Sequence, residues 1–129
     1  MTTAEIRDYF TAQFPWSESC SIGKIDNNKE TAVCFYLNTP QTNQTAFGGK
    51  QNVGSEKISV NVLLRAGRNA KNAEAQAMQI YAFFDERTFY MHDKRVFVIS
   101  RYDTPVPLGT DAQGVYEYSF SFDFYKQKG

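Results

Sequence analysis

The chain has 129 residues, with 14 Lys and Arg against 14 Asp and Glu, so its formal charge is zero. This length is typical of one domain with an ordinary hydrophobic core. A chain without excess positive charge lacks the usual signature of sequence-specific nucleic-acid binding or of attraction to anionic lipid. No apolar run approaches the roughly 18 residues of a membrane span, so we expect no membrane partner.

The N-terminal segment has helical periodicity. Residues 2–14 place apolar side chains on one stripe at Ile6, Tyr9, Phe10 and Phe14. They predict an amphipathic helix with Thr2 or Thr3 as its N-cap, ended by Pro15. The segment lacks the basic start and apolar stretch of a secretory signal, which predicts a cytoplasmic location.

Three strands are predicted next. Residues 18–25 and 31–38 alternate or have β-branched and aromatic composition, and the turn at 26–30 suggests an antiparallel hairpin. Residues 57–64 place Ile, Val, Val and Leu at alternate positions, so this strand too should bury one face.

A polar segment at 39–56 separates the second and third strands. It contains three Gly and no aliphatic residue larger than Val53. Such a stretch cannot bury enough apolar surface to offset its ordering entropy, which predicts a long flexible loop. A loop of this length is either a tolerated insertion or a segment that contacts a partner.

The C-terminal half is predicted to contain one helix and two or three strands. The helix begins near Asn69 and ends near Glu86, with small residues in its first half. Residues 96–101 form a strand that can pair with residues 88–92 across a turn. Residues 104–114, with two Pro and two Gly, are predicted to be a stiff connector to the last strand.

The last strand, 115–126, is aromatic at every second position. One face carries Tyr116, Tyr118, Phe120, Phe122 and Phe124. The other face carries Glu117, Ser119, Ser121 and Asp123. A base-stacking platform would pair its aromatic residues with a basic groove, whereas the polar residues here are Glu, Ser and Asp. The pattern therefore favours a core strand.

These elements predict a single α+β domain with a mostly antiparallel sheet and two helices packed on one face. The strands place Ser59, Asn61, Ser121 and Asp123 on the opposite face. We expect that face to be solvated or to contact neighbouring subunits.

No pattern of catalytic residues emerges. The single histidine, His92, lies at a predicted turn, while Cys20 and Cys34 lie inside strand patterns rather than at an electropositive helix N-terminus. No Cys or His cluster has the spacing of metal ligands, and no glycine-containing segment has the spacing of a phosphate-binding loop. We therefore predict a protein that is not an enzyme, with no catalytic, metal or cofactor site.

Residues 56–126 resemble a known family. ISVNVLLRAG, then NAEAQAMQIYAFFD, the connector PVPLGTDAQG and the closing YEYSFSFDFY are similar to small minor capsid and tail terminator proteins of long-tailed bacteriophages and prophages. The N-terminal helix and strands fit the family order only loosely. The resemblance implies one tail-terminator-like domain over residues 1–129.

The resemblance also implies a structural role in virion assembly. Such a protein forms a ring, commonly a hexamer, at the end of the tail tube, where it stops tail growth and joins the tail to the head. Its partners would be further copies of itself, the tail tube protein and a head completion or connector protein. It would be found in the host cytoplasm during assembly and then in the virion.

In that role the loop at 39–56 would become ordered against the tail tube or the neighbouring subunit. Phe47 would be its apolar anchor. Hydrogen bonds to the partner would come from four polar residues: Gln44, Lys50, Gln51 and Asn52.

A second function remains possible on the sequence alone. A ferredoxin-like ligand-binding or small enzyme domain would have a pocket between the sheet and the helix at 69–86. That function needs polar groups on the apolar side of the sheet, where the strand patterns supply few beyond the hydroxyls of Tyr116 and Tyr118.

Overall fold

The computed structural model describes residues 1–16, 18–37 and 55–127. These residues form a single α+β domain of two helices and one curled, seven-stranded sheet, as the sequence predicts. In chain order they are α1 (Thr3–Gln13), β1 (Ser19–Ile22), β2 (Thr31–Leu37), β3 (Ser55–Ala66), α2 (Ala70–Phe84), β4 (Thr88–Met91), β5 (Lys94–Ser100), β6 (Val106–Thr110) and β7 (Tyr116–Gln127). Among the described residues, no helix is long and apolar enough to cross a membrane.

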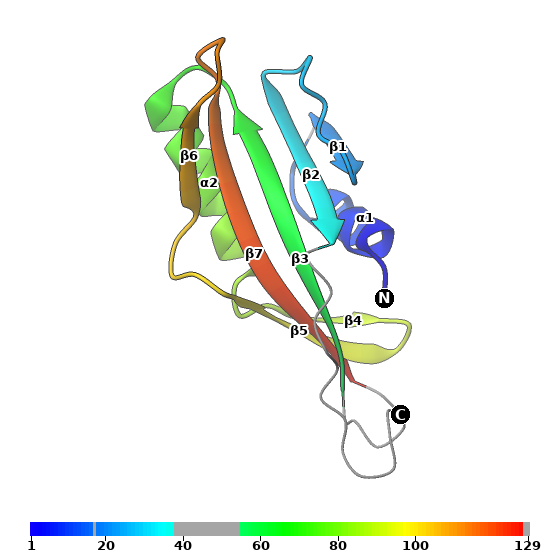
Figure 1. The fold of residues 1–129 in the computed structure, drawn as a ribbon. Coiled ribbons are helices and arrows are strands. Elements are labelled where there is room, and N and C mark those ends of the chain that lie inside the picture. Colours follow the sequence, from blue (N-terminus) through cyan, green and yellow to red (C-terminus); the bar gives the residue numbers. More distant parts are fainter. Residues whose placement is uncertain (17, 38–54, 128–129) are drawn as a thin grey trace.

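The sheet is built around two long neighbouring strands, β3 and β7. Its order is β1-β2-β3-β7-β5-β4, and β6 pairs with β7 outside this path. Figure 1 shows β3 and β7 running the length of the molecule, with α2 behind them. All strand pairs except β1–β2 are antiparallel.

Helix α1 begins where the sequence predicts. The Thr2 side chain accepts a hydrogen bond from the Glu5 N–H at 3.2 Å, and a Glu5 carboxylate oxygen accepts one from the Thr2 N–H at 2.9 Å. This reciprocal capping box satisfies two N–H groups that the first turn would leave unpaired. The helix buries Ile6 and Phe10 completely.

The core is an aromatic cluster between the helices and the inner face of the sheet. Phe84 of α2 lies at its centre, with ring centroids 5.1 Å from Phe122, 5.6 Å from Phe10 and 5.9 Å from Phe35. Phe120, Phe122 and Phe124 are almost fully buried. The alternating aromatic residues of β7 are therefore core residues, as predicted, and Tyr116 and Tyr118 pack at the margin of the cluster.

The predicted antiparallel hairpin between β1 and β2 is wrong, because the two strands are parallel. Ser19 is opposite Ala32 and Ile22 is opposite Phe35. A parallel connection usually needs a dozen or more residues. Here β1 has four residues, so the connection at 23–30 need reach back only about 13 Å. Alternation of side chains is the same for both directions, so the sequence pattern could not distinguish them.

The predicted connector at 104–114 also differs from the structure, because it contains strand β6. Val106 is opposite Ser119 and Thr110 is opposite Tyr116. Pro107 is tolerated because β6 is an edge strand that pairs only with β7. A residue without an N–H donor breaks no hydrogen bond on the unpaired side of such a strand. A register shift between Pro107 and Gly109 absorbs the irregularity.

The predicted pairing of residues 88–92 with 96–101 is confirmed as the β4–β5 hairpin. Its turn lies at His92 and Asp93. Both have positive φ, 53° and 61°. That conformation is the one required by a two-residue type I′ loop, which matches the right-handed twist of the flanking strands.

We predict that Phe122→Ala destabilises the fold by about 3–5 kcal/mol, because it leaves a cavity beside Phe84 in the closed core. Phe97→Ala is the matched control. The Phe97 ring is 38% exposed on the opposite face of the sheet, and its loss should cost about 1 kcal/mol. Urea unfolding of both variants measures the difference, and equal midpoints would contradict the core position of Phe122.

Candidate interaction surface

The residues predicted to contact a partner lie outside the described part of the chain. They are Gln44, Phe47, Lys50, Gln51 and Asn52, all within 38–54. Their role therefore stays a prediction.

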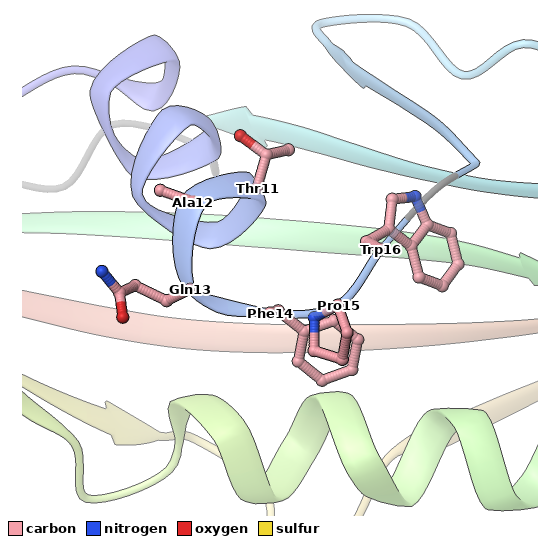
Figure 2. Close-up of a pocket in the computed structure, with 6 residues that line it drawn as sticks. All are labelled: Thr11, Ala12, Gln13, Phe14, Pro15 and Trp16. Carbon is pink, nitrogen blue, oxygen red and sulfur yellow. The ribbon is translucent and has the colours of Figure 1, made fainter.

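A hollow at the end of α1 is not lined by catalytic side chains. Its volume is about 580 Å³, and six consecutive residues, Thr11, Ala12, Gln13, Phe14, Pro15 and Trp16, line it (Figure 2). None of the six has a group that titrates in the ordinary pH range. The Trp16 indole N–H donates to the Ser19 carbonyl at 3.1 Å, so this donor is already used within the chain.

The thiols and the histidine are not arranged for nucleophilic chemistry. Burial raises the pKa of Cys20 to about 11 and also raises the pKa of Cys34, so both thiols are protonated at neutral pH. His92 is exposed at the hairpin turn and contacts the Glu5 carboxylate. That contact lowers the pKa of Glu5. Among the described residues, no group of three or more His, Cys, Asp or Glu could hold a metal ion.

The outer side of the sheet has no helical cover. Both helices pack on the other side, where the core lies. We call the opposite side the helix-free face. On β3 and β7 it presents alternate residues: Lys57, Ser59, Asn61, Leu63 and Arg65, paired with Tyr125, Asp123, Ser121, Ser119 and Glu117. Polar residues thus follow the middle of both long strands.

The middle of the helix-free face contains a buried carboxylate. Asp123 is 7% exposed. Its carboxylate accepts a hydrogen bond from the Ser59 hydroxyl at 2.6 Å and one from Arg101 Nε at 3.0 Å. A second Arg101 nitrogen donates to the Ser59 hydroxyl at 2.8 Å. The charge of Asp123 is therefore balanced, as a buried carboxylate requires.

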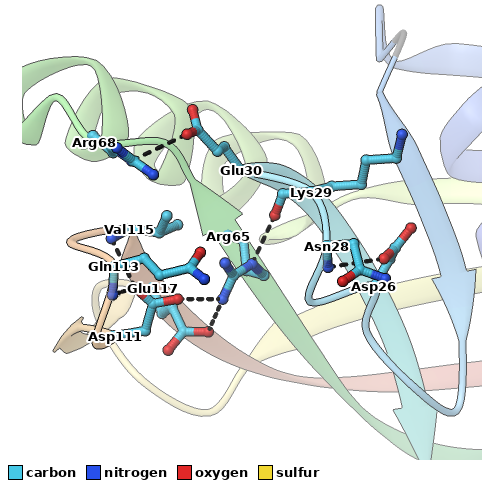
Figure 3. A network of polar contacts seen from close by, with 10 residues as sticks. All are labelled: Asp26, Asn28, Lys29, Glu30, Arg65, Arg68, Asp111, Gln113, Val115 and Glu117. Atoms are coloured by element: carbon cyan, nitrogen blue, oxygen red, sulfur yellow. Dashed lines mark hydrogen bonds and ion pairs between the residues drawn. The ribbon is translucent and has the colours of Figure 1, made fainter.

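One end of the helix-free face is organised by Arg65, which is only 3% exposed. The same guanidinium nitrogen lies 3.0 Å from Asp111 Oδ2 and 3.2 Å from Glu117 Oε2, and Nε donates to the Lys29 carbonyl at 2.9 Å. Figure 3 shows how these contacts join β3, β7, the turn before β7 and the connection before β2. A single guanidinium thus fixes four segments that are distant in sequence.

The Asp111 carboxylate of this network is held in its charged form. Asp111 Oδ1 accepts hydrogen bonds from the backbone N–H groups of Val115 at 3.0 Å and Gln113 at 2.8 Å. These bonds, with the neighbouring Arg65, lower the pKa of Asp111 below its ordinary value of 3.8. Glu117 and Asp111 together carry two negative charges beside one positive charge, so this end has an excess of negative charge.

The sequence pattern predicts a solvated position for Glu117 and assigns no structural role to Arg65, Asp111 or Arg101. The sequence does contain one indication of the position of Arg65. Arg65 interrupts an apolar strand at an even number of residues from Ser59, so both side chains are expected on the outer side of the sheet. Its partners depend on strand register and on the path of β6, which the sequence pattern did not give.

Comparison with known proteins identifies the family. Residues 12–128 match the bacteriophage tail terminator proteins. The chain belongs to the bacteriophage tail terminator family. The comparison with curated proteins found no match.

A protein of known structure has the same fold. A solved structure that is 15% identical in sequence superposes with a TM-score of 0.61, over 98% of this chain and 92% of its own. At that identity the likeness concerns the fold alone. Tail terminators are structural, non-enzymatic proteins and components of the virion, and they interact with the tail tube. The family assignment thus decides against the ligand-binding or enzyme alternative.

We predict that Arg65→Leu destabilises the protein by about 3–5 kcal/mol, because it removes the cation from two carboxylates that are largely covered. Arg68→Leu is the matched control. Arg68 pairs with Glu30 at 3.0 Å, but both side chains are 58% exposed, so its loss should cost less than about 1 kcal/mol. Denaturant unfolding measures both values. Similar losses in the two variants would show that the Arg65 network is dispensable.

A second prediction concerns acid stability. Because the folded state lowers the pKa of Asp111, the charged group contributes stability above its unfolded pKa, and this contribution disappears as pH falls through the lower folded value. Asp111→Asn keeps the Oδ1 acceptor but loses the charge. The stability gap between the protein and this variant should be constant near neutral pH and should close below about pH 3.8. Unfolding midpoints measured between neutral and acidic pH test this, and a gap independent of pH would contradict it.

Proposed function

We propose that this tail terminator assembles as a ring, a hexamer, on the end of the tail tube, where it stops tail growth and joins the tail to the head. The observation that carries the proposal is the family match over residues 12–128. Assembly of this kind requires surfaces rather than reactive groups. The helix-free face, which follows both long strands, is a polar surface available for such contacts.

Ring formation places a definite demand on the subunit. Each copy must use one patch toward one neighbour and a different patch toward the other, and such head-to-tail contacts close a ring only when the rotation from copy to copy closes on itself. The balanced charge of the chain permits close approach of many copies, since there is no net repulsion to overcome. Charges distributed unevenly over a neutral subunit can then fix the orientation of neighbours.

The tail tube is the first partner of the assembled ring, and a head completion or connector protein is the second. The two partners would bind at opposite ends of the ring axis. The protein would accumulate in the host cytoplasm during assembly and become part of the virion when the tail is finished.

We further propose that the segment at 39–56 contacts the tail tube or the ring neighbour. The proposal rests on its sequence: a polar composition with Phe47 as its one aromatic residue. Interfaces draw most of their binding energy from a few aromatic anchors. Gln44, Lys50, Gln51 and Asn52 would supply the hydrogen bonds around that anchor.

Phe47→Ala should leave the melting temperature nearly unchanged and should impair tail completion. The test is complementation of a phage or prophage that lacks this gene, with tail lengths measured by electron microscopy. We expect tails of irregular length from Phe47→Ala and from a variant in which residues 43–53 are replaced by a short Gly-Ser linker.

Tyr102→Ala serves as the control, because it removes an exposed aromatic ring at a different position in the sequence; Tyr102 is 54% exposed. Tails of normal length are expected from this variant. Normal tails from the Gly-Ser variant would instead make the segment a tolerated insertion. A strain that forms normal tails without the gene would overturn the terminator function itself.

A further inference from the structure

The helix-free face carries a group of exposed aromatic and aliphatic side chains where β4 and β5 meet the C-terminal half of β7. Tyr90 is 71% exposed, Phe97 38% and Ile99 40%. Strand register places Phe97 opposite Tyr125, and Tyr125 opposite Lys57. We call this region the aromatic end; it consists of Lys57, Tyr90, Arg95, Phe97, Ile99 and Tyr125. Exposed aromatic and aliphatic side chains grouped on neighbouring strands are typical of a protein interaction surface.

Arg95 gives the aromatic end an exposed positive charge. Arg95 lies directly opposite Tyr90 in the hairpin and is exposed. In the described residues it has no carboxylate within ion-pair distance. The Lys57 ammonium lies 5.9 Å from the centre of the Tyr125 ring. An arginine beside exposed aromatic rings is the composition that interface centres favour, and it calls for an acidic partner.

The opposite end of the same face supplies the complementary charge. Asp111 and Glu117 share the guanidinium of Arg65, and their side chains are still 25% and 23% exposed. In the network of Figure 3, four carboxylates (Asp26, Glu30, Asp111 and Glu117) meet three cations (Lys29, Arg65 and Arg68), which leaves one excess negative charge. The Lys29 side chain extends away from Asp111 and Glu117 in that view. We call Asp111, Gln113 and Glu117 the acidic end.

The two ends are far apart and face different directions. Lys57–Tyr125 and Arg65–Glu117 are pairs of the same ladder, and eight residues along a strand correspond to about 26 Å. Figure 1 shows β3 edge-on near its start and broadside near its end, so the sheet turns between the two ends. One copy therefore cannot join its own ends, whereas two copies can join them head to tail.

We propose that the aromatic end of one subunit binds the acidic end of the next subunit in the ring. This inference rests on the proposed ring assembly and assigns the two patches that it requires. Arg95 of one copy faces the shared carboxylates of the other, and Tyr90 and Phe97 are covered by the contact. The contact is heterologous, since each copy contributes a different end to each neighbour.

Cross-linking on finished tails tests the contact between copies directly. The variant carries Arg95→Cys and Gln113→Cys in a chain whose own thiols are removed by Cys20→Ala and Cys34→Ala. Tails assembled with it by complementation are treated with a short bismaleimide reagent. We expect a ladder of multimers up to the full ring. Each single-cysteine variant should give no ladder, because a heterologous contact does not bring identical positions together.

Three outcomes would overturn the assignment: no multimers on tails of normal length, dimers from either single variant, or cross-links to the tail tube protein in place of multimers. The last would assign the aromatic end to the tube. Failure of the proposed terminator function is detected separately, by tail length. If that function is wrong, tails have the same length with and without the gene.

A pair of charge variants tests the electrostatic part of the proposal. The measured quantity is the protein concentration that caps half of the tails in an extract lacking the gene product. Arg95→Ala should raise this concentration about two- to fivefold per contact. Gln113→Glu should lower the concentration by a similar factor in the natural sequence. In a chain that also carries Arg95→Ala, Gln113→Glu should have no such effect. Lys71→Ala, which removes an exposed cation from α2, should change nothing. Equal effects of Gln113→Glu in both backgrounds would contradict the pairing.

Discussion

The pairing of β3 with β7 determines what both sides of the molecule present. Eleven consecutive residue pairs join the two strands, from Ser55–Gln127 to Arg65–Glu117. Because side chains alternate across a sheet, one register places Val60 with Phe122 in the core and Asn61 with Ser121 outside. A shift by one residue would exchange the two sets, burying Ser and Asp beneath the helices. The core and the helix-free face are therefore specified by a single ladder.

Much of this arrangement could be predicted from sequence, because it follows from local periodicity. The aromatic alternation of β7, the helix start near Thr2 and the stripe of Ile6 and Phe10 each lie within one element and were identified correctly. The errors concern relations between elements. The direction of β1 depends on the path of its connection, and Pro107 enters a strand because β6 pairs on one side only. The partners of Arg65 come from three other segments, so no local pattern identifies them.

The polar groups on the helix-free face are satisfied mainly by one another. The Ser121 hydroxyl lies 2.6 Å from Asn61 Oδ1, and Asp123 is held by Ser59 and Arg101. A surface of this kind does not gain much free energy from burial, since its hydrogen bonds are already made and its water must be removed. The exposed aromatic rings beside it carry most of the hydrophobic driving force available to a contact. In a contact made by this face, the exposed aromatic rings would therefore supply the affinity, and the charged and polar groups would supply the orientation.

This division suits a subunit that must assemble only at the right place. A single contact between two polar faces, with a small aromatic patch and a few ion pairs, is weak, because association costs translational and rotational freedom that such a contact barely offsets. In the proposed ring, copies held side by side on a tail tube would already have lost that freedom, and each would gain contacts to two neighbours at a high effective concentration. A subunit with weak but directional contacts can therefore stay dispersed in solution and close a ring on its template.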